Sequence, residues 1–401
     1  MGIVVQKFGG TSVKNTERLF NVARIVTETY AKGNDVAVVV SAQGDTTDEL
    51  IEKAKEIGDH PSPREMDALM ATGEQMSAAL LAMAIGQLGY PVKSLTGWQA
   101  GFETDSTYGN SRIRRVNVER IEHEFGKHNI VVVTGFQGIN RYDDITTLGR
   151  GGSDTSAVAL AAALKADRCQ IFTDVDGVYT ADPRLVKKAQ KLDAITYDEM
   201  LELASLGAQV LHNRSVEMAK KYSVNLEVLS SLEKKPGTQI KEVVKVEKML
   251  IRGVARDNDV VRISIVGIAD QPGIAYQVFS LLASKKINVD IILQSIGRDG
   301  TKDISFTVSR GNMEQAMELT EELKESLGAQ RVVCDDQVSK VSVVGAGMVA
   351  NPGVAAKVFG ALADANINIQ MIATSEIKIS VIIALQDSEK AMNAIHDAFF
   401  D

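Results

Sequence analysis

Apolar runs alternate with amphipathic stretches over residues 1–230 of the chain. Between the first two runs, Leu19, Val22, Ala23 and Val26 show the i, i+3, i+4, i+7 spacing of an amphipathic helix. The pattern indicates an α/β domain with a mainly parallel sheet. Because ligands of such sheets bind beyond the carboxyl ends of the strands, the residues after each run are candidates for chemistry. The runs predict strands at residues 3–8, 36–40, 91–95, 130–134, 169–173 and 225–229.

An internal repeat fills the C-terminal part of the chain. Two similar stretches begin at Ile263 (ISIVGIADQPGIAYQVFSLLASKKINVDII) and at Val341 (VSVVGAGMVANPGVAAKVFGALADANINIQMI). Each reads as strand, Pro-Gly turn, helix, strand, strand, helix, and the offset of about 80 residues is near the size of a small domain. The polar residues 233–248 contain a Pro-Gly breaker and are interpreted as a linker between a catalytic domain, 1–232, and the repeat.

The second copy of the repeat has no room for a last strand. Its second helix, at about 388–399, runs to the C-terminus, whereas the first copy has residues 330–334 for that strand. A strand-like segment at 249–255 precedes the first copy and belongs to no other predicted element. We expect this segment to pair into the sheet of the second module. The first module, 257–336, would then be inserted between 249–256 and 337–401.

Composition and charge narrow the class of protein. The 401 residues are 45% hydrophobic and 24% charged, which is typical of globular proteins, and the net charge is −8. No basic run predicts a nucleic-acid or membrane partner. Cys169 and Cys334 are too few for a disulfide scaffold or a zinc ribbon and fit a reducing cytosol. We see no signal peptide, no apolar run of membrane-spanning length and no histidines at metal-ligand spacing, so we expect a cytoplasmic protein without its own metal site.

The segment from Lys7 to Val13 (KFGGTSV) lies between the first predicted strand and the first helix. Glycines allow backbone amides to approach an anion, and a helix N-terminus favours negative charge. Lys7 adds a point charge that can reach a transferring phosphoryl group. A tight turn with Thr11 or Ser12 as helix cap is the alternative interpretation. The sequence G-x-x-x-x-G-K-[ST] does not occur, so a P-loop enzyme is excluded.

Two further motifs contain hydroxyls and glycines. Residues 41–48 (SAQGDTTD) follow a predicted strand, and they are either a ligand loop or a helix start capped by Thr46 or Thr47. Residues 147–155 (TLGRGGSDT) place three glycines around Arg150, a side chain suited to bidentate recognition of a carboxylate. A glycine-rich loop with a surface arginine is the alternative for this motif.

Acidic residues mark two more candidates. Residues 173–184 (TDVDGVYTADPR) suggest a calcium loop that begins at Asp174. Counted from Asp174, the twelfth position of an EF-hand is Leu185 instead of a glutamate, so we favour a nucleotide-facing loop. Glu74 follows Gly73 inside an Ala-, Met- and Leu-rich helix at 64–88. A glycine is costly there unless another segment comes close. A charge at the helix edge is the alternative interpretation of Glu74.

Together, KFGGTSV, SAQGDTTDEL, GRGGSDT and TDVDGVYTADPR occur in an order that resembles the aspartokinases of the amino-acid kinase superfamily. The resemblance covers the whole chain, because a tandem pair of ACT modules after the kinase domain is also an aspartokinase feature. It implies an αβα sandwich followed by two α+β ferredoxin-like (βαββαβ) modules. It also implies transfer of a phosphoryl group from ATP, with Mg²⁺, to L-aspartate. The product, 4-phospho-L-aspartate, leads to lysine (through diaminopimelate), threonine and methionine.

The resemblance assigns roles to individual residues. Glu74 would hold the α-ammonium of aspartate and Arg150 its α-carboxylate, while Asp154 would orient Lys7. The catalytic residues would be Lys7, Gly9, Gly10 and Asp154. The substrate-binding residues would be Ser41, Thr47, Glu74, Arg150 and Ser153. The ATP-binding residues would be Lys7, Gly9, Gly10, Ser41, Thr173, Asp174, Tyr179, Arg184 and Gln209.

The chain departs from the family in one motif. Relatives often have GAKVLHPR where this chain has GAQVLHNR at 207–214. Gln209 replaces a lysine that can contact the nucleotide, and Asn213 replaces a proline, whereas the phosphoryl centre is unchanged. The acceptor carboxylate is already ionised at neutral pH, so no general base is required. Catalysis then depends on positioning and charge neutralisation.

The repeat is expected to bind an inhibitory amino acid, lysine or threonine, and to form a homodimer or a higher oligomer. Pro-Gly turns open one helix in each copy, and their amides could receive an effector carboxylate. Asn366 and Asn368 could instead end helices and turns. Some relatives also make a shorter regulatory subunit from an internal start, and Met249 stands where such a product could begin. The expected effector contacts are Asp270, Pro272, Gly273, Ile274, Ala275, Gln294, Asn366, Asn368, Ser375 and Glu376.

Two rival functions fit parts of the sequence. The first is another amino-acid kinase, acting on glutamate, acetylglutamate, carbamate or UMP, and it is disfavoured by the repeat and by the pair Glu74 and Arg150. The second is a non-catalytic amino-acid sensor, which the intact Lys7, Arg150 and Asp154 disfavour.

Overall fold

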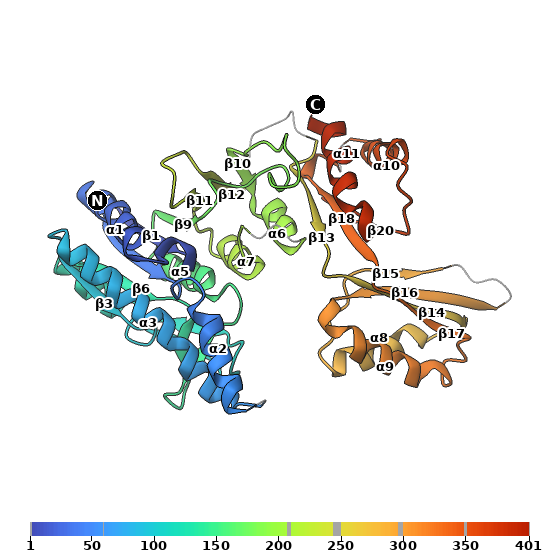
Figure 1. The fold of residues 1–401 in the computed structure, drawn as a ribbon, viewed down its shortest axis with the longest axis horizontal. Coiled ribbons are helices and arrows are strands. Elements are labelled where there is room, and N and C mark those ends of the chain that lie inside the picture. The colour runs from blue at the N-terminus through green and yellow to red at the C-terminus, as the bar shows by residue number, and fades with distance from the viewer. Residues whose placement is uncertain are drawn as a thin grey trace. The chain divides into compact units, whose positions relative to one another are not determined.

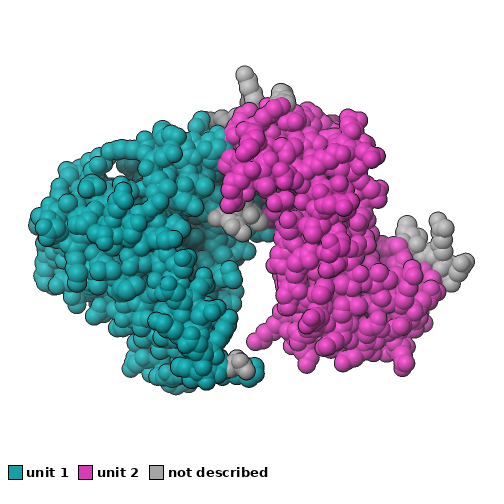
Figure 2. Space-filling view, viewed as in Figure 1, with its two compact units in different colours: residues 1–179, 191–205, 209–246 teal, residues 180–190, 206–208, 247–401 magenta. Residues whose placement is uncertain are grey.

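The computed structural model describes residues 2–58, 60–206, 210–243, 250–295, 300–348 and 351–400 (Figure 1). The chain folds into two compact units, drawn in teal and magenta in Figure 2. Unit 1 comprises Met1–Tyr179, Lys191–Ser205 and Gln209–Val246. Unit 2 comprises Thr180–Gln190, Leu206–Ala208 and Glu247–Asp401.

An eight-stranded sheet forms the centre of unit 1, in the order β10-β12-β11-β9-β1-β2-β6-β3. Neighbouring strands are parallel except β11 and β12. The six predicted strands are confirmed, each to within one residue at either end. A smaller sheet has the order β5-β4-β7-β8. The strands are β1 (Ile3–Phe8), β2 (Asp35–Val40), β3 (Val92–Leu95), β4 (Phe102–Thr104), β5 (Ile113–Val116), β6 (Ile130–Thr134), β7 (Gln137–Ile139), β8 (Ile145–Thr147), β9 (Arg168–Thr173), β10 (Ala194–Thr196), β11 (Leu226–Ser230) and β12 (Thr238–Lys241).

Helices cover both faces of the large sheet. Val36, Val38 and Val40 pack with α1 and α3 in one core, whereas α5 packs against β1, β2 and β9. Alternate residues of a strand point to opposite faces, so runs that are apolar at every position suit a sheet covered on both sides. Unit 1 is therefore an αβα sandwich. Its helices are α1 (Thr16–Ala31), α2 (Thr46–Ile57), α3 (Pro63–Gln87), α4 (Glu119–Gly126), α5 (Gly152–Ala163), α6 (Tyr197–Ser205) and α7 (Asn213–Lys221).

Helix α3 corrects one expectation from the sequence. In the part of the chain that the structure describes, it is the one helix long and apolar enough to cross a membrane by length and composition. Leu81 and Ile85 of α3 pack instead in the core beneath the sheet, and the helix also buries Asp67 and Glu74. Its apolar composition therefore reflects a helix in a protein core.

The proposed linker at 233–248 is wrong for residues 238–241, which form strand β12. Thr238 and Ile240 are buried while Gln239 and Lys241 are exposed, which is the alternation of a strand with one face in the core and one face in solvent. The Pro236-Gly237 pair closes the turn between β11 and β12. A Cβ on Gly237 would lie 2.0 Å from the Val228 carbonyl oxygen, so the turn requires glycine there.

Residues 180–190 belong to unit 2, although the sequence prediction places them in a catalytic domain at 1–232. Ala181 and Val186 are buried in the same apolar cluster as Val254. The Thr180 carbonyl accepts a hydrogen bond from the Val254 amide at 2.8 Å. These few apolar side chains show no periodicity that would have revealed their partner.

Two similar modules make up the rest of unit 2. The first has the sheet β15-β16-β14-β17 with α8 and α9, and the second has β13-β18-β20-β19 with α10 and α11. The predicted pairing of the segment 249–255 is confirmed for residues 253–255, because Gly253–Asp257 runs antiparallel to β18, whereas residues 250–252 are outside the strand. Met249 lies outside the described residues. The elements are β13 (Gly253–Asp257), β14 (Val261–Ala269), α8 (Ile274–Ser284), β15 (Ile292–Gln294), β16 (Thr301–Val308), α9 (Met313–Lys324), β17 (Arg331–Asp335), β18 (Val338–Val344), α10 (Val354–Asp364), β19 (Met371–Thr374), β20 (Lys378–Ala384) and α11 (Ser388–Phe400).

Candidate active site

Four adjacent parallel strands of unit 1, β9, β1, β2 and β6, end at the same edge of the large sheet. The glycine loop of KFGGTSV follows β1, the SAQG loop follows β2, and the TDVDG loop follows β9. Three of the sequence motifs therefore meet at one edge, as the rule for open parallel sheets predicts.

Lys7 and Asp154 form an ion pair at this edge. The Lys7 Nζ lies 2.6 Å from Asp154 Oδ1, and each side chain is only 12% exposed. Lys7 is the next-to-last residue of β1, and Asp154 lies in the first turn of α5, which packs on β1. The carboxylate thus fixes the direction of a largely buried cation.

The glycine loop does not lead directly into α1. Gly10–Val13 form a 3-10 turn, and α1 starts at Thr16 with Asn15 as its cap, so a cap at Thr11 or Ser12 is wrong. The Ser12 hydroxyl bonds instead to Ser231 Oγ at 2.7 Å. A Cβ on Gly10 would lie 2.5 Å from the Ala42 carbonyl oxygen, so glycine is required where this loop packs against the SAQG loop.

Glu74 is a buried carboxylate with one unsatisfied oxygen. It is 4% exposed, its Oε1 accepts a hydrogen bond from the Ala42 amide at 3.1 Å, and its Oε2 has no partner within the described residues. Burial raises the pKa of Glu74 to about 7. Gly73 allows this approach, since a Cβ there would lie 2.8 Å from the Ala42 Cβ. The expectation that another segment comes close to Gly73 is confirmed, and the free Oε2 is suited to a cationic ligand.

Arg150 lies between β8 and α5, with an exposed guanidinium. It lines a polar cavity of about 530 Å³ together with Arg112, His212 and Arg214. Glu74 is not among the residues that line this cavity. Ser153 lies beyond the loop, in α5, where its hydroxyl packs against the backbone after β6. A Cβ on Gly135 would lie 2.7 Å from Ser153 Oγ.

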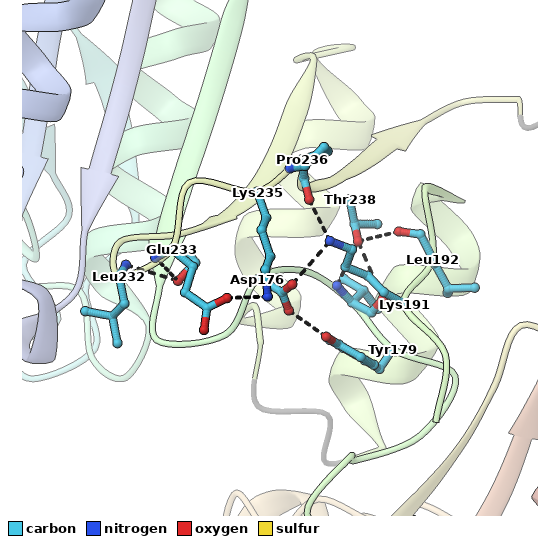
Figure 3. A network of polar contacts seen from close by, with 11 residues as sticks. Asp176, Tyr179, Lys191, Leu192, Leu232, Glu233, Lys235, Pro236 and Thr238 are labelled. Atoms are coloured by element: carbon cyan, nitrogen blue, oxygen red, sulfur yellow. Dashed lines mark hydrogen bonds and ion pairs between the residues drawn. The ribbon is translucent and has the colours of Figure 1, made fainter. Parts of the chain in front are cut away.

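A network of polar contacts holds the loop after β9, as Figure 3 shows. The Tyr179 hydroxyl donates to Asp176 Oδ1 at 2.6 Å, and the Lys191 ammonium contacts Asp176 Oδ2 at 3.2 Å and the Pro236 carbonyl at 2.8 Å. The Asp176 carboxylate raises the pKa of Tyr179 to about 12. The Tyr179 hydroxyl is thus occupied inside the loop, and the ATP role of Tyr179 stays a prediction.

The other predicted ATP contacts are more scattered. Asp174 is exposed, and its Oδ1 accepts a hydrogen bond from the Thr173 hydroxyl at 3.0 Å. Arg184 belongs to unit 2, where its Nε donates to Asp182 Oδ1 at 3.0 Å and its Nη2 donates to Asp182 Oδ2 at 2.7 Å, a bidentate ion pair. Gln209 lies outside the described residues. An ATP role for Arg184 and Gln209 stays a prediction.

Ser41 and Thr47 lie where the sequence places them. The Ser41 amide donates to the Phe8 carbonyl at 3.1 Å, so Ser41 follows β2 beside the end of β1. Helix α2 starts at Thr46, next to Thr47, and Asp45 occupies the cap position. The alternative in which Thr46 or Thr47 caps that helix is therefore wrong.

Sequence reasoning missed Asp67, Phe136 and Arg214. Asp67 is a fully buried acid on α3. Its position in the sequence could have indicated this, because it lies seven residues before Glu74 on the same face of an apolar helix. Phe136 follows β6 and has a φ of +70°, which is unusual for a bulky side chain. Arg214 is the last residue of the GAQVLHNR motif, and it donates to two backbone carbonyls of the site, partners that the motif itself does not reveal.

Unit 2 contains a cavity of about 340 Å³ in its second module. The Pro352-Gly353 turn at the start of α10 forms one side, and Ser375 and Glu376 form another. Two of the predicted effector contacts thus share a pocket with a helix N-terminus. The corresponding turn of the first module, with Pro272, Gly273, Ile274 and Ala275, opens α8 in the same way.

Three predicted effector contacts have other partners or positions. Asp270 Oδ1 lies 2.9 Å from the Lys302 ammonium, so its charge is already paired. Asn366 has a φ of +53° just after α10, as Lys286 has one of +60° just after α8. Asn366 therefore ends a helix in both its conformation and its place in the repeat, which favours the alternative interpretation of this residue. Gln294 is exposed at the end of the edge strand β15.

Comparison with known proteins identifies the family. Residues 2–230 match the amino acid kinase family, and residues 263–322 and 341–399 match the ACT domain. The chain is 52% identical to an aspartokinase of Geobacillus stearothermophilus and 50% identical to aspartokinase 2 of Bacillus subtilis strain 168, covering 100% of this chain and 97% and 98% of theirs. Escherichia coli aspartokinase III in complex with aspartate and ADP matches with a TM-score of 0.83 and 26% identity over 100% of both chains. The chain therefore belongs to the aspartokinases of the amino acid kinase family.

Proposed function

We propose that this chain transfers the γ-phosphoryl group of ATP to the β-carboxylate of L-aspartate by positioning and charge neutralisation, without a general base. The observation that carries the proposal is the ion pair of Lys7 and Asp154 at the carboxyl end of β1. A fixed, largely buried cation is suited to the charge on a transferring phosphoryl group. The acceptor carboxylate is ionised at neutral pH, so it can attack directly. The E. coli relative with a TM-score of 0.83 binds aspartate and ADP, which supports the choice of substrates.

Formation of aspartyl hydroxamate from ATP, aspartate and hydroxylamine tests the reaction. We expect ATP-dependent hydroxamate with aspartate and little with glutamate at the same concentration. A preference for glutamate would contradict the proposed substrate, and no hydroxamate from either would favour the non-catalytic sensor.

Mg²⁺ fits this site as a partner of the nucleotide. Within the described residues, there is no group of three or more His, Cys, Asp or Glu side chains that could hold a metal ion by itself. Mg²⁺ is usually held by one or two carboxylates together with substrate phosphates. Asp174, at the end of β9, and Asp154 are the carboxylates that would hold it. When bound, the metal would neutralise phosphate charge, while Lys7 and the backbone of the glycine loop orient the transferred group.

Arg150→Ala is expected to weaken aspartate binding. The guanidinium would hold the α-carboxylate, and a hydrogen bond between charged groups contributes about 1.5–3 kcal/mol, so the KM for aspartate should rise roughly ten- to a hundredfold. Steady-state kinetics with varied aspartate measures this change. Arg115→Ala, an exposed arginine of β5 outside the cavity, is the control. An unchanged KM in the Arg150 variant would mean that the substrate site is misplaced.

The cavity of the second module is the proposed effector site. The amides at the start of α10 would receive the carboxylate of lysine or threonine, and Glu376 would receive an amino group. A lysine complex is known for the E. coli relative with a TM-score of 0.76. Lysine or threonine bound in this cavity would inhibit the kinase, so that the end products of the pathway regulate its first step.

Titration of lysine and threonine, singly and together, tests feedback. Inhibition should reflect a coupling free energy of about 1–3 kcal/mol, which is roughly a five- to 150-fold change in affinity. Glu376→Gln should shift the inhibition curve to higher effector concentration, whereas Glu389→Gln, an exposed acid of α11 outside the cavity, should not. No inhibition of the full chain by millimolar lysine or threonine would contradict the regulatory role.

The modules are also the proposed site of self-association in the cytoplasm. β15 is an edge strand, and its Ile292 and Leu293 are 54% and 41% exposed. Unpaired edge strands with apolar side chains readily pair with another chain. A homodimer through this edge, or an assembly with a shorter regulatory subunit beginning near Met249, fits the feature.

A further inference from the structure

The loop that carries Arg150 needs external support. Residues 148–151, here termed the Arg150 loop, contain two glycines with positive φ, Gly149 at +76° and Gly151 at +66°. Glycine allows many backbone conformations, so the residues of this loop do not by themselves select one conformation. Within the described residues, the Arg150 guanidinium makes no hydrogen bond or ion pair that would hold it. The direction of Arg150 must therefore come from what holds the loop backbone.

Asp67 holds the start of this loop. It lies on α3 with no exposed surface, and its carboxylate accepts hydrogen bonds from the Thr147 amide at 2.9 Å and the Thr147 hydroxyl at 2.7 Å. The same carboxylate accepts the Gly109 amide at 3.0 and 2.9 Å. A buried carboxylate is costly unless it is fully hydrogen-bonded, and here three donors from two segments converge on it. Asp67 thus joins the end of β8 to the turn between β4 and β5.

Arg214 holds the next residue of the loop. Its Nη1 donates to the Leu148 carbonyl at 2.8 Å, and its Nη2 donates to the Ser111 carbonyl at 2.7 Å. The amide and the hydroxyl of Ser111 in turn donate to the Thr147 carbonyl at 2.8 and 2.9 Å. Two charged side chains, from α3 and α7, therefore both bind residues 147–148, immediately before the Arg150 position, and the turn at 109–111.

We propose that Asp67 and Arg214 are positioning residues that fix the Arg150 loop so that Arg150 meets the substrate carboxylate. Neither acts on the reacting atoms. The inference rests on the proposed role of Arg150 in binding aspartate. Because small displacements of a substrate-orienting group can lower rates by roughly a hundredfold, loss of either support should be visible in kinetics with aspartate.

Asp67→Asn is the first test. The amide keeps the shape of the carboxylate but replaces one acceptor with an NH₂ group facing backbone N–H donors. We expect kcat/KM for aspartate to fall roughly ten- to a hundredfold, while the KM for ATP changes less than about threefold. The control is Glu124→Gln, which alters another buried, hydrogen-bonded carboxylate on α4, away from the loop. That variant should leave kcat/KM for aspartate within about twofold of the wild type.

A double-mutant cycle separates positioning from other effects. If Asp67 acts through Arg150, Asp67→Asn should have little further effect on kcat/KM for aspartate in the Arg150→Ala background. Two full, multiplying effects would overturn the inference, as would a single Asp67 variant with unchanged aspartate kinetics. If Arg150→Ala alone has no effect, the proposed function of Arg150 fails first, and that outcome is distinct from the others.

Thr147→Val and Arg214→Met keep the proposal testable if Asp67→Asn does not fold. Thr147→Val removes only the hydroxyl donated to Asp67 and keeps the backbone bonds, so it should lower kcat/KM for aspartate in the same direction by a smaller factor. Arg214→Met removes both carbonyl contacts and keeps the aliphatic stem. Aspartate kinetics within twofold of the wild type in both variants would overturn the proposal.

Discussion

Lys7→Ala should lower kcat by roughly a hundredfold or more and leave the fold intact. The Lys7 ammonium is held by Asp154 at 2.6 Å, so it is preorganised for the charge that develops on the transferring phosphoryl group. Loss of one preorganised donor of this kind costs about 3 kcal/mol or more in the transition state. The hydroxamate assay at saturating aspartate and ATP measures the change. The KM for aspartate should move much less than kcat, because the remote substrate contacts remain.

Lys14→Ala is the matched control for this prediction. Lys14 lies just after the same glycine loop, its side chain is 60% exposed, and its distance of 4.0 Å to Asp45 makes a weak surface pair. Its removal should leave kcat within about twofold of the wild type. Thermal unfolding should accompany both assays, since Lys7→Ala leaves Asp154 without its cation. A Lys7 variant with kcat within threefold of the wild type would contradict the catalytic role.

The edge of the large sheet where the candidate active site lies could be predicted from the sequence, because one pattern recurs along unit 1. Each buried strand is followed at once by glycine, hydroxyl or charged residues, as at Gly9, Ser41 and Asp174. Parallel strands bring these ends together, so the motifs meet without any long-range information. The second module could be predicted for a similar reason. A repeat copy that ends without its last strand requires one from elsewhere, and β13 supplies it.

Other features depend on pairs of residues far apart in the sequence. Asp67 and Thr147 are 80 residues apart, and Arg214 and Ser111 are 103 apart, so no local pattern links them. Thr238 and Ile240 lie in a polar stretch, and their alternation becomes a strand through pairing with the distant β10 and the neighbouring β11. Single-sequence reasoning detects periodicity and motifs, whereas hydrogen bonds between distant loops require the fold.

Glu74→Gln should raise the free energy of unfolding of the ligand-free protein at pH 8 and weaken its binding of aspartate. The ordinary pKa of 4.5 rises to about 7 on burial, so the folded protein binds a proton more tightly than the unfolded chain. Stability of the wild type therefore falls as pH rises from about 4.5 to about 7, by roughly 3 kcal/mol in total. Glutamine keeps the bond from the Ala42 amide and removes the charge. Its free energy of unfolding at pH 8 should exceed that of the wild type by less than this amount, because the unpartnered amide is still buried.

The same substitution removes the proposed partner of the substrate ammonium. Truncating one member of a buried charge pair costs about 2–5 kcal/mol, so kcat/KM for aspartate at pH 8 should fall roughly a hundredfold. In the wild type, kcat/KM should decline as pH falls below about 7, because Glu74 becomes protonated. The glutamine variant has no such group and should lack this part of the pH dependence. Steady-state kinetics from about pH 5.5 to 8.5 compares the two profiles.

Glu124→Gln provides a control whose stability effect has the opposite sign. Hydrogen bonds from Asn129 and Arg120 outweigh the effect of burial and hold the pKa of Glu124 below its usual range, so its ionised form is favoured in the folded state. Its neutralisation should lower stability at pH 8 and leave aspartate kinetics unchanged. Denaturant unfolding at pH 5 and pH 8 should show a gain for Glu74→Gln only at pH 8. Aspartate kinetics for Glu74→Gln within threefold of the wild type at pH 8 would remove Glu74 from the substrate site, even if the predicted gain in stability were observed.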